Sequence, residues 1–258
     1  MLNRNCVVII STLLFLGDAA FVDNLSQCEI KDTNCQKNLF QNILKVQSKT
    51  GIPEYNIPVF DPIILKDVNV PVLNAANLTL VEGKLKGLSG CVFNDFTTHV
   101  DSGLASVDMT CDLTLSGKYT AFSDSELIKS VLGGDSIRGD GKTKVKIEKL
   151  NMKFDFKFKV IKKDGETYLK GKDGSLSYKY DVLGKVSFAA NNLFMGDQDV
   201  SVTVTNLLNQ SWKLVMQTVG NQLMSKAMER VKALIGNLFD HVPTKYFISE
   251  DLSAYVTN

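Results

Sequence analysis

The segment from Asn206 to Val242 contains no proline, and its apolar residues recur three or four positions apart. This period is typical of an amphipathic helix. At about 1.5 Å per residue, a helix of this length would span roughly 50 Å, several times the average in globular proteins. Its apolar stripe comprises Leu208, Trp212, Val215, Val219, Leu223, Ala227, Val231, Ile235 and Leu238, widened by Leu207, Leu214, Met216, Met224, Met228 and Leu234. So wide a stripe has to be covered by another part of the chain.

The candidate for this cover is the segment from Ile57 to Thr205, which has the pattern of β-strands. Its clearest strand alternates apolar with polar residues, which predicts one buried face and one face in water. The apolar positions of this strand are Leu150, Met152, Phe154, Phe156, Phe158 and Val160. Val145 and Ile147 have the opposite parity, so we expect a bulge near Glu148 and Lys149 that curves the strand.

Two Asp-Gly pairs, Asp164-Gly165 and Asp173-Gly174, are typical of hairpin turns, and they predict an antiparallel sheet. The apolar alternation resumes after the second pair, at Leu176, Tyr178, Tyr180 and Val182. We therefore expect an α+β fold, in which a strongly curved antiparallel sheet wraps around the long C-terminal helix. Such a fold has an elongated apolar interior, which suits a hydrophobic ligand.

A short helix is expected near the amino end. Asp32, Thr33 and Asn34 offer cap residues, and Gly51 with Pro53 ends the helical pattern. The apolar positions between them are Leu39, Phe40, Ile43, Leu44 and Val46.

Residues 1–19 have the pattern of a cleaved signal peptide. One basic residue, Arg4, precedes an apolar run from Cys6 to Leu16, and small residues stand at Gly17 and Ala19. The run is shorter than the roughly 20 apolar residues of a membrane span, and no other stretch is apolar enough. We expect a secreted, extracellular protein without a transmembrane anchor, in which residues 20–258 form one domain.

Four cysteines remain after cleavage, in a compartment where pairing is expected. Cys28 and Cys35 bracket a short polar loop, and we expect them to bond. Cys91 and Cys111 flank a turn signal, so they would face each other across a hairpin, either as a disulfide or as a buried free pair. Three sequons predict glycosylation at Asn24, Asn77 and Asn209.

The sequence offers few residues that could act in catalysis. The two histidines, His99 and His241, lie at a predicted turn and a helix end, where surface roles are the usual ones. The sequence shows no phosphate loop, no Cys/His metal spacing and no dinucleotide fingerprint. We therefore expect no enzyme, no cofactor and no metal. A net charge of +1 also gives no field that would attract nucleic acid.

Several motifs occur together in an order that resembles the takeout and haemolymph juvenile-hormone-binding protein family of insects. They are the Cys28 to Cys35 spacing, Ile57-Pro58-x-Phe60-Asp61-Pro62, Gly117-Lys118-Tyr119, Asn192-Leu193-Phe194-x-Gly196-Asp197, Leu208-Asn209-x-x-Trp212 and Val242-Pro243-x-x-x-Tyr246-Phe247. The resemblance implies a tubular lipid-binding fold with a hydrophobic ligand held along the long helix. Relatives often have a proline early in this helix. Here Val219-Gly220 stands in that region, so we expect any bend to come from the glycine.

The function implied is that of a carrier, expected to be monomeric, for a small lipophilic ligand such as juvenile hormone, a related terpenoid or a fatty compound. Tyr178 or Tyr180 would orient the polar end of the ligand. The residues expected to contact ligand are Phe40, Ile43, Phe154, Phe156, Phe158, Tyr178, Tyr180, Trp212, Val215, Met216, Val219 and Leu223.

An alternative function rests on the charge between Arg138 and Lys172, where twelve Lys/Arg residues stand against five Asp/Glu. The basic face of the sheet would then bind anionic microbial lipid, a membrane surface, a receptor or another protein partner. Lysines on the wet face of a strand also discourage edge aggregation, which is their commoner role.

Overall fold

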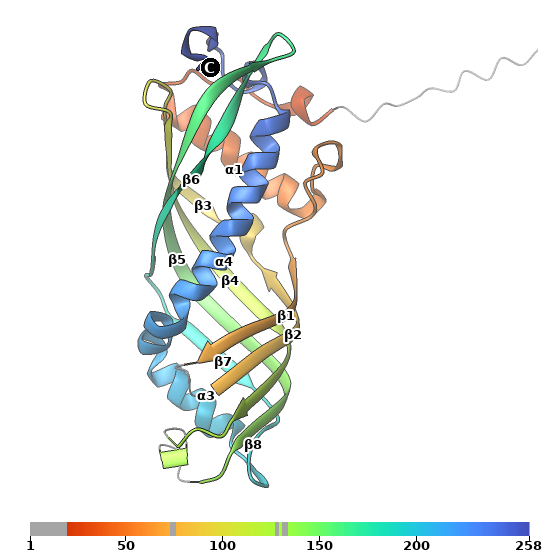
Figure 1. The fold of residues 1–258 in the computed structure, drawn as a ribbon, viewed down its shortest axis with the longest axis vertical. Helices are drawn as coiled ribbons and strands as arrows, with labels where there is room; N and C mark the ends of the chain where they lie inside the picture. Colours follow the sequence, from red (N-terminus) through yellow and green to blue (C-terminus); the bar gives the residue numbers. More distant parts are fainter. Residues whose placement is uncertain (1–19, 73–75, 127–128, 131–133, 258) are drawn as a thin grey trace, which may run out of the picture.

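The computed structural model describes residues 20–72, 76–126, 129–130 and 134–257, so the expected signal peptide lies outside the described residues. The molecule is elongated, and a long helix crosses the sheet between its two ends (Figure 1). The helices are α1 (Thr33–Thr50), α3 (Ser201–Gln210) and α4 (Trp212–His241). The strands are β1 (Ile63–Val72), β2 (Ala76–Lys86), β3 (Val92–His99), β4 (Leu104–Ser123), β5 (Ile137–Lys163), β6 (Glu166–Val182), β7 (Val186–Ala190), β8 (Leu193–Met195) and β9 (Gln198–Asp199).

The described strands form one antiparallel sheet, which is organised around the two long strands β4 and β5. β4 carries β2 and β3 on its other side, and β1 follows β2. β5 carries β6, β7 and β8 in succession on its other side. The sheet does not close on itself, and α4 packs between its edges, mainly against β6 and lightly against β1. The expected fold class is therefore confirmed.

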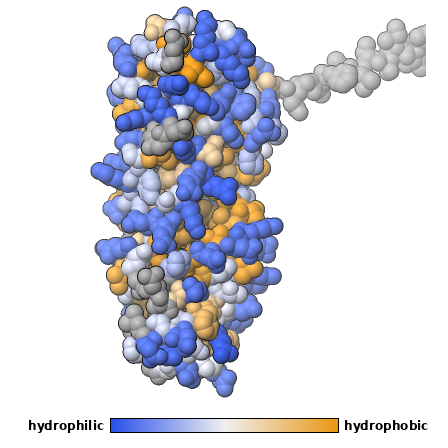
Figure 2. All heavy atoms as spheres, in the orientation of Figure 1, coloured by the Kyte–Doolittle hydropathy of each residue, from blue (hydrophilic) through white to orange (hydrophobic). Residues whose placement is uncertain are grey.

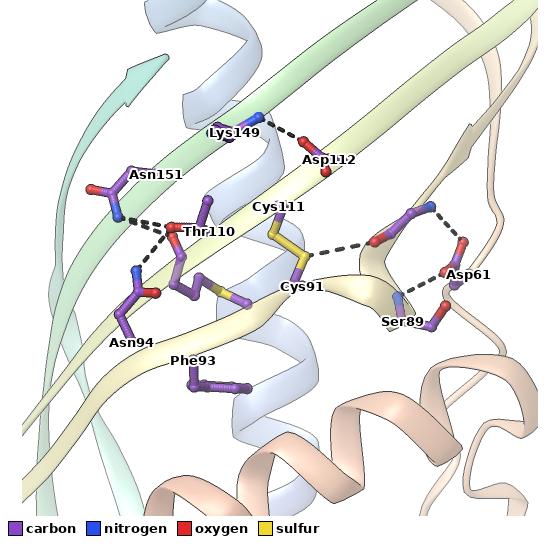
Figure 3. The surroundings of a disulfide bond; sticks show 12 residues. Asp61, Ser89, Cys91, Phe93, Asn94, Thr110, Cys111, Asp112, Lys149 and Asn151 are labelled. Atoms are coloured by element: carbon purple, nitrogen blue, oxygen red, sulfur yellow. Dashed lines mark hydrogen bonds between the residues drawn. A yellow bond between two sulfur atoms is a disulfide. The ribbon is translucent and has the colours of Figure 1, made fainter. Parts of the chain in front are cut away.

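The expected bulge in β5 is present. The register with β4 passes from Leu113 opposite Ile147 to Cys111 opposite Leu150, so β5 has one extra residue there. Lys149 takes a left-handed conformation, with φ at 52°, and its N–H donates to the Asp112 carboxylate at 2.7 Å (Figure 3). Beyond the bulge, the six apolar positions from Leu150 to Val160 are all buried, as the alternation predicts.

Only one of the two Asp-Gly pairs is a hairpin turn. Asp164 and Gly165 have φ values of 51° and 84° and connect β5 to β6. The prediction for Asp173-Gly174 is wrong, because β6 continues through this pair to Val182. Its register with β5 shifts between Phe156 and Phe158, so the pair lies in an irregularity of a paired strand. β5 extends beyond this point and still offers β6 a backbone partner.

The helix α1 begins and ends as expected. The Asp32 side chain accepts a hydrogen bond from the Cys35 N–H at 2.9 Å, and Gly51 ends the helix with φ at 70°. The expected disulfide between Cys28 and Cys35 is confirmed. The backbone of Cys28 also pairs with the segment around Ile248, so this bridge joins the start of α1 to the carboxyl end of the chain.

Cys91 and Cys111 also form a disulfide, which decides between the two alternatives that the sequence left open. Cys91 directly precedes β3 and Cys111 lies opposite it in β4 (Figure 3). The side chain of Gln41 in α1 donates to the Cys91 carbonyl at 2.8 Å and accepts from the Phe93 N–H at 2.9 Å. α1 is thereby docked on the edge of β3, beside the bridge.

The long C-terminal helix is not continuous, which corrects the prediction from the sequence. Helix α3 ends at Gln210 and α4 begins at Trp212, with Ser211 between them. Asn209 exchanges two hydrogen bonds with the backbone of Phe188 in β7, at 2.6 and 3.0 Å. This contact fixes α3 on β7, whereas α4 packs on β6. The chain has to turn between them, and Gly220, where a bend was expected, is helical.

Among the described residues, no helix combines the length and apolar character required for a membrane span.

Candidate ligand-binding site

The main apolar cluster lies between the inner face of the sheet, α1 and α4. β5 contributes aromatic side chains to it, and α4 contributes Met224, Met228 and Phe239. Methionine side chains are flexible and adapt to the shape of a ligand. An apolar cluster therefore lies between the sheet and α4, where the sequence predicts burial.

A cavity of about 20 Å³ lies at the α1 end of this interior. Phe40 and Phe96 stack in its wall with ring centroids 4.4 Å apart. A second cavity, of about 10 Å³, shares Phe40, Phe239 and Phe247 with the first. Sites for drug-sized ligands usually measure about 300–1,000 Å³. A ligand of that size would therefore have to displace side chains on entering this end of the interior.

The structure divides the expected ligand contacts into two groups. Phe156 and Phe158 line the first cavity, Ile43 lines the second, and Phe40 lines both. Phe154 is buried in the same cluster, and Tyr178 packs against it. Tyr180 also packs against this cluster. The remaining expected contacts lie on the first half of α4 and line neither cavity: Trp212, Val215, Met216, Val219 and Leu223.

The expected apolar stripe of α4 is buried or half-buried except at Leu223, and at Leu214 on its margin. Val219, Met224 and Met228 are 8%, 7% and 4% exposed, whereas Leu223 is 38% exposed. The expectation that Leu223 faces the sheet is therefore wrong.

The hydroxyl of Tyr180, which was expected to orient a ligand, holds α4 against β6 instead. It lies 3.1 Å from Oδ1 of Asn221 and 3.4 Å from the carbonyl oxygen of Met216. Burial raises the pKa of this hydroxyl, so it stays a neutral donor at physiological pH. Gly220 is buried directly beneath it, and a Cβ atom at this position would overlap the hydroxyl.

We expect Gly220→Ala to destabilise the protein by about 1–2 kcal/mol, because the added methyl displaces Tyr180 and breaks its hydrogen bond to Asn221. Gly236 provides a matched control in the same helix, since a Cβ there meets open space. Gly236→Ala should stabilise by up to about 1 kcal/mol through helix propensity. Urea unfolding measures both, and a stabilising Gly220→Ala would contradict this role of Tyr180.

The exposed surface beside α4 is also apolar in part. Figure 2 shows an apolar area about halfway along the molecule, where Figure 1 draws β1 and β2. Exposed apolar side chains in these elements include Ile64 of β1 and Val81 of β2, and α4 adds Leu214 and Leu223.

Several residues that line the first cavity were not among the expected ligand contacts, and Gln36 is the most polar of them. Gln36 of α1 is 4% exposed and lines the first cavity. Its Nε2 donates to the carbonyl oxygens of Glu29 and Ile30, at 3.1 and 2.7 Å. A signal was present, because Gln36, Phe40 and Ile43 follow one another at helical spacing on one face.

The sequence pattern of the family described as "Haemolymph juvenile hormone binding protein" matches residues 6–249. The chain belongs to this family. The circadian clock-controlled protein daywake of Drosophila melanogaster is 23% identical over 247 residues, which cover 90% of this chain and 89% of that protein. The crystal structure of Epiphyas postvittana Takeout 1 superposes with a TM-score of 0.76 at 27% identity, covering 88% of this chain and 100% of that chain. The resemblance found in the sequence is confirmed.

Membership in the haemolymph juvenile hormone binding protein family suggests a carrier of a hydrophobic ligand. The family consists of binding proteins and includes no known enzymes. The described residues hold no cluster of three or more side chains that could bind a metal ion.

The basic outer face of the sheet is partly neutralised by neighbouring acids. Lys153 of β5 lies 3.0 Å from the Asp108 carboxylate of β4. Burial by itself would raise the pKa of Asp108, but hydrogen bonds from Asn94, Lys153 and Asn151 outweigh it and lower the pKa. This carboxylate is therefore charged at neutral pH and offsets part of the lysine field.

The three sequons lie in different surroundings. Asn24 and Asn77 are exposed. The amide of Asn209 is half-buried and bonded to Phe188, so a glycan at Asn209 would disturb the contact that fixes α3.

Proposed function

We propose that the protein is a secreted carrier that holds a small lipophilic molecule, such as juvenile hormone, a related terpenoid or a fatty compound, beneath α4. The observation that supports it most is the apolar cluster that runs from Met224 and Met228 to the cavity beside Phe40. Burial of apolar ligand surface, at about 25 cal/mol per Å², would supply most of the affinity.

The proposal includes the processing and organisation of the chain. Residues 1–19 would be removed as a signal peptide, and residues 20–258 would act as one extracellular, monomeric domain. Glycans would be attached at Asn24 and Asn77, whose side chains are exposed.

A second candidate is a recognition module that binds anionic lipid or a partner through the basic face. The exposed Lys153 and Lys157 on the outer face of β5 favour it. The Asp108 carboxylate beside Lys153 weighs against it, because it reduces the net charge that an anion would meet.

The two functions predict opposite responses to salt and charge. For a carrier, a neutral terpenoid should bind with a Kd near 1 μM, about −8 kcal/mol, at both low and high salt. The double variant Lys153→Glu/Lys157→Glu should leave this affinity unchanged, because both side chains lie on the face opposite the apolar interior. Fluorescence titration with the terpenoid and with vesicles of an anionic phospholipid measures both responses.

A folded double variant, verified by circular dichroism, is needed for the comparison, since Lys153→Glu places a carboxylate beside Asp108. Binding of the phospholipid alone, weakened by salt and lost in the double variant, would refute the carrier and support the recognition module.

A further inference from the structure

Gln36, which lines the cavity at the α1 end, carries a hydrogen-bond acceptor that the fold leaves unused. Gln36 is 4% exposed, and its Oε1 atom is buried with no hydrogen-bond partner among the described residues. Buried polar atoms without a partner are rare in native proteins, and each costs about 1–3 kcal/mol.

The orientation of the Gln36 amide is fixed by the hydrogen bonds of its NH2 group. Nε2 donates to the carbonyl oxygens of Glu29 and Ile30. A flipped amide would place Oε1 against these two oxygens, which are also acceptors, and would lose both hydrogen bonds. The group that remains for a ligand is therefore an acceptor, and it requires a donor.

The rest of the cavity wall is largely apolar. Leu39 and Phe40 come from α1, and Phe156, Phe239 and Phe247 from the other side. Thr98 is the other polar side chain in this wall, and its hydroxyl can donate or accept. A ligand oxygen that only accepts could bond to Thr98, but it would leave Oε1 of Gln36 unpaired.

We propose that Gln36 binds the hydroxyl group of a lipophilic alcohol and selects it over esters, epoxides and ethers, which only accept hydrogen bonds. This inference rests on the proposed carrier function and names its ligand class. The existing volume of about 20 Å³ admits a group of the size of a hydroxymethyl without large changes. The hydrocarbon chain then extends along α4 toward Met228 and Met224, whose side chains adapt to it.

The test compares two isomers of equal size, dodecanol and methyl undecyl ether, which differ in the hydroxyl donor. Each displaces a fluorescent fatty-acid probe from the secreted protein. We expect dodecanol to bind about tenfold more tightly, since only it satisfies Oε1. In Gln36→Met, which keeps the side-chain length and removes the acceptor, the two affinities should differ by less than about twofold.

Gln41→Met is the matched control. It makes the same change on the same helix, but the Gln41 amide bonds the β3 edge and lies outside the cavity wall. The tenfold preference should persist in this variant, which separates a loss of the acceptor from a general loosening of α1.

The outcomes distinguish this inference from the proposed function. Equal binding of both isomers to the unmodified protein would overturn the role of Gln36 and leave the carrier intact. Failure of the probe and of both isomers to bind would refute the carrier. If Gln36→Met does not fold, the preference measured on the unmodified protein decides by itself.

Discussion

Lysine in place of Met228 should lower the free energy of unfolding by at least about 3 kcal/mol and abolish binding of a fluorescent lipid. Met228 is 4% exposed and lies in the main cluster between α4 and the sheet. A charged ammonium at this position would lie in an apolar cluster without an acidic partner. The protein must therefore either unfold locally or release the proton that charges the group. Both outcomes disturb the apolar interior in which the ligand is proposed to lie.

Leu223→Lys is the matched control for this prediction. The sequence period placed Leu223 on the buried stripe, but the structure leaves it 38% exposed. Its replacement should change the stability by less than about 1 kcal/mol, as at most surface positions. Urea unfolding of both variants is decisive, and equal losses of stability would show that Leu223 is buried as Met228 is.

Removal of the second disulfide should cost more than removal of the first. Cys91 and Cys111 are separated by 20 residues, and Cys28 and Cys35 by 7. In the chain-entropy model, a bridge that closes the longer loop stabilises by about 3 kcal/mol, and one that closes the shorter loop by about 2 kcal/mol. Both sulfurs of the second bridge are also buried, so Cys91→Ala/Cys111→Ala loses packing in addition.

Chemical denaturation of the two double-alanine variants measures this order. The second bridge also adjoins the Cys91 carbonyl that Gln41 binds, so its loss should loosen α1 on β3. Faster hydrogen exchange in α1 of Cys91→Ala/Cys111→Ala would report this. A smaller loss of stability in this variant than in Cys28→Ala/Cys35→Ala would contradict the prediction.

Local patterns in the sequence were sufficient to predict the elements whose geometry is set by neighbouring residues. The alternation from Leu150 to Val160 predicted the inner face of β5, and the change of parity before Glu148 predicted the bulge. Asp32 and Gly51 predicted both ends of α1. These signals are local, because strand faces, bulges and helix caps are set by the backbone geometry of a few consecutive residues.

Features that depend on contacts between distant segments could not be predicted from local sequence patterns. Asp173-Gly174 has the composition of a turn, but the length of β5 keeps it within β6. The polar run Asn209-Gln210-Ser211 is compatible in the sequence with a continuous helix. In the structure, the side chain of Asn209 is hydrogen-bonded to the backbone of Phe188. An exposed amide forms its hydrogen bonds with water, and these place no constraint on where a helix ends. Only the contact with β7 gives the Asn209 side chain protein partners that stabilise the end of α3 near this residue.

The sequence by itself determined that a curved antiparallel sheet would cover a long apolar C-terminal helix, since both periods are strong and no other segment could bury them. The tertiary structure alone decided which positions at the edge of the apolar stripe of α4 stay exposed and where the interior has an unused acceptor. The helical period put Leu223 in the apolar stripe of α4, and only the packing of the helix against the sheet leaves this side chain 38% exposed. Likewise, a glutamine in the first turns of a helix is ordinarily solvated, and Gln36 becomes a candidate ligand contact only because β4, β5 and α4 enclose it.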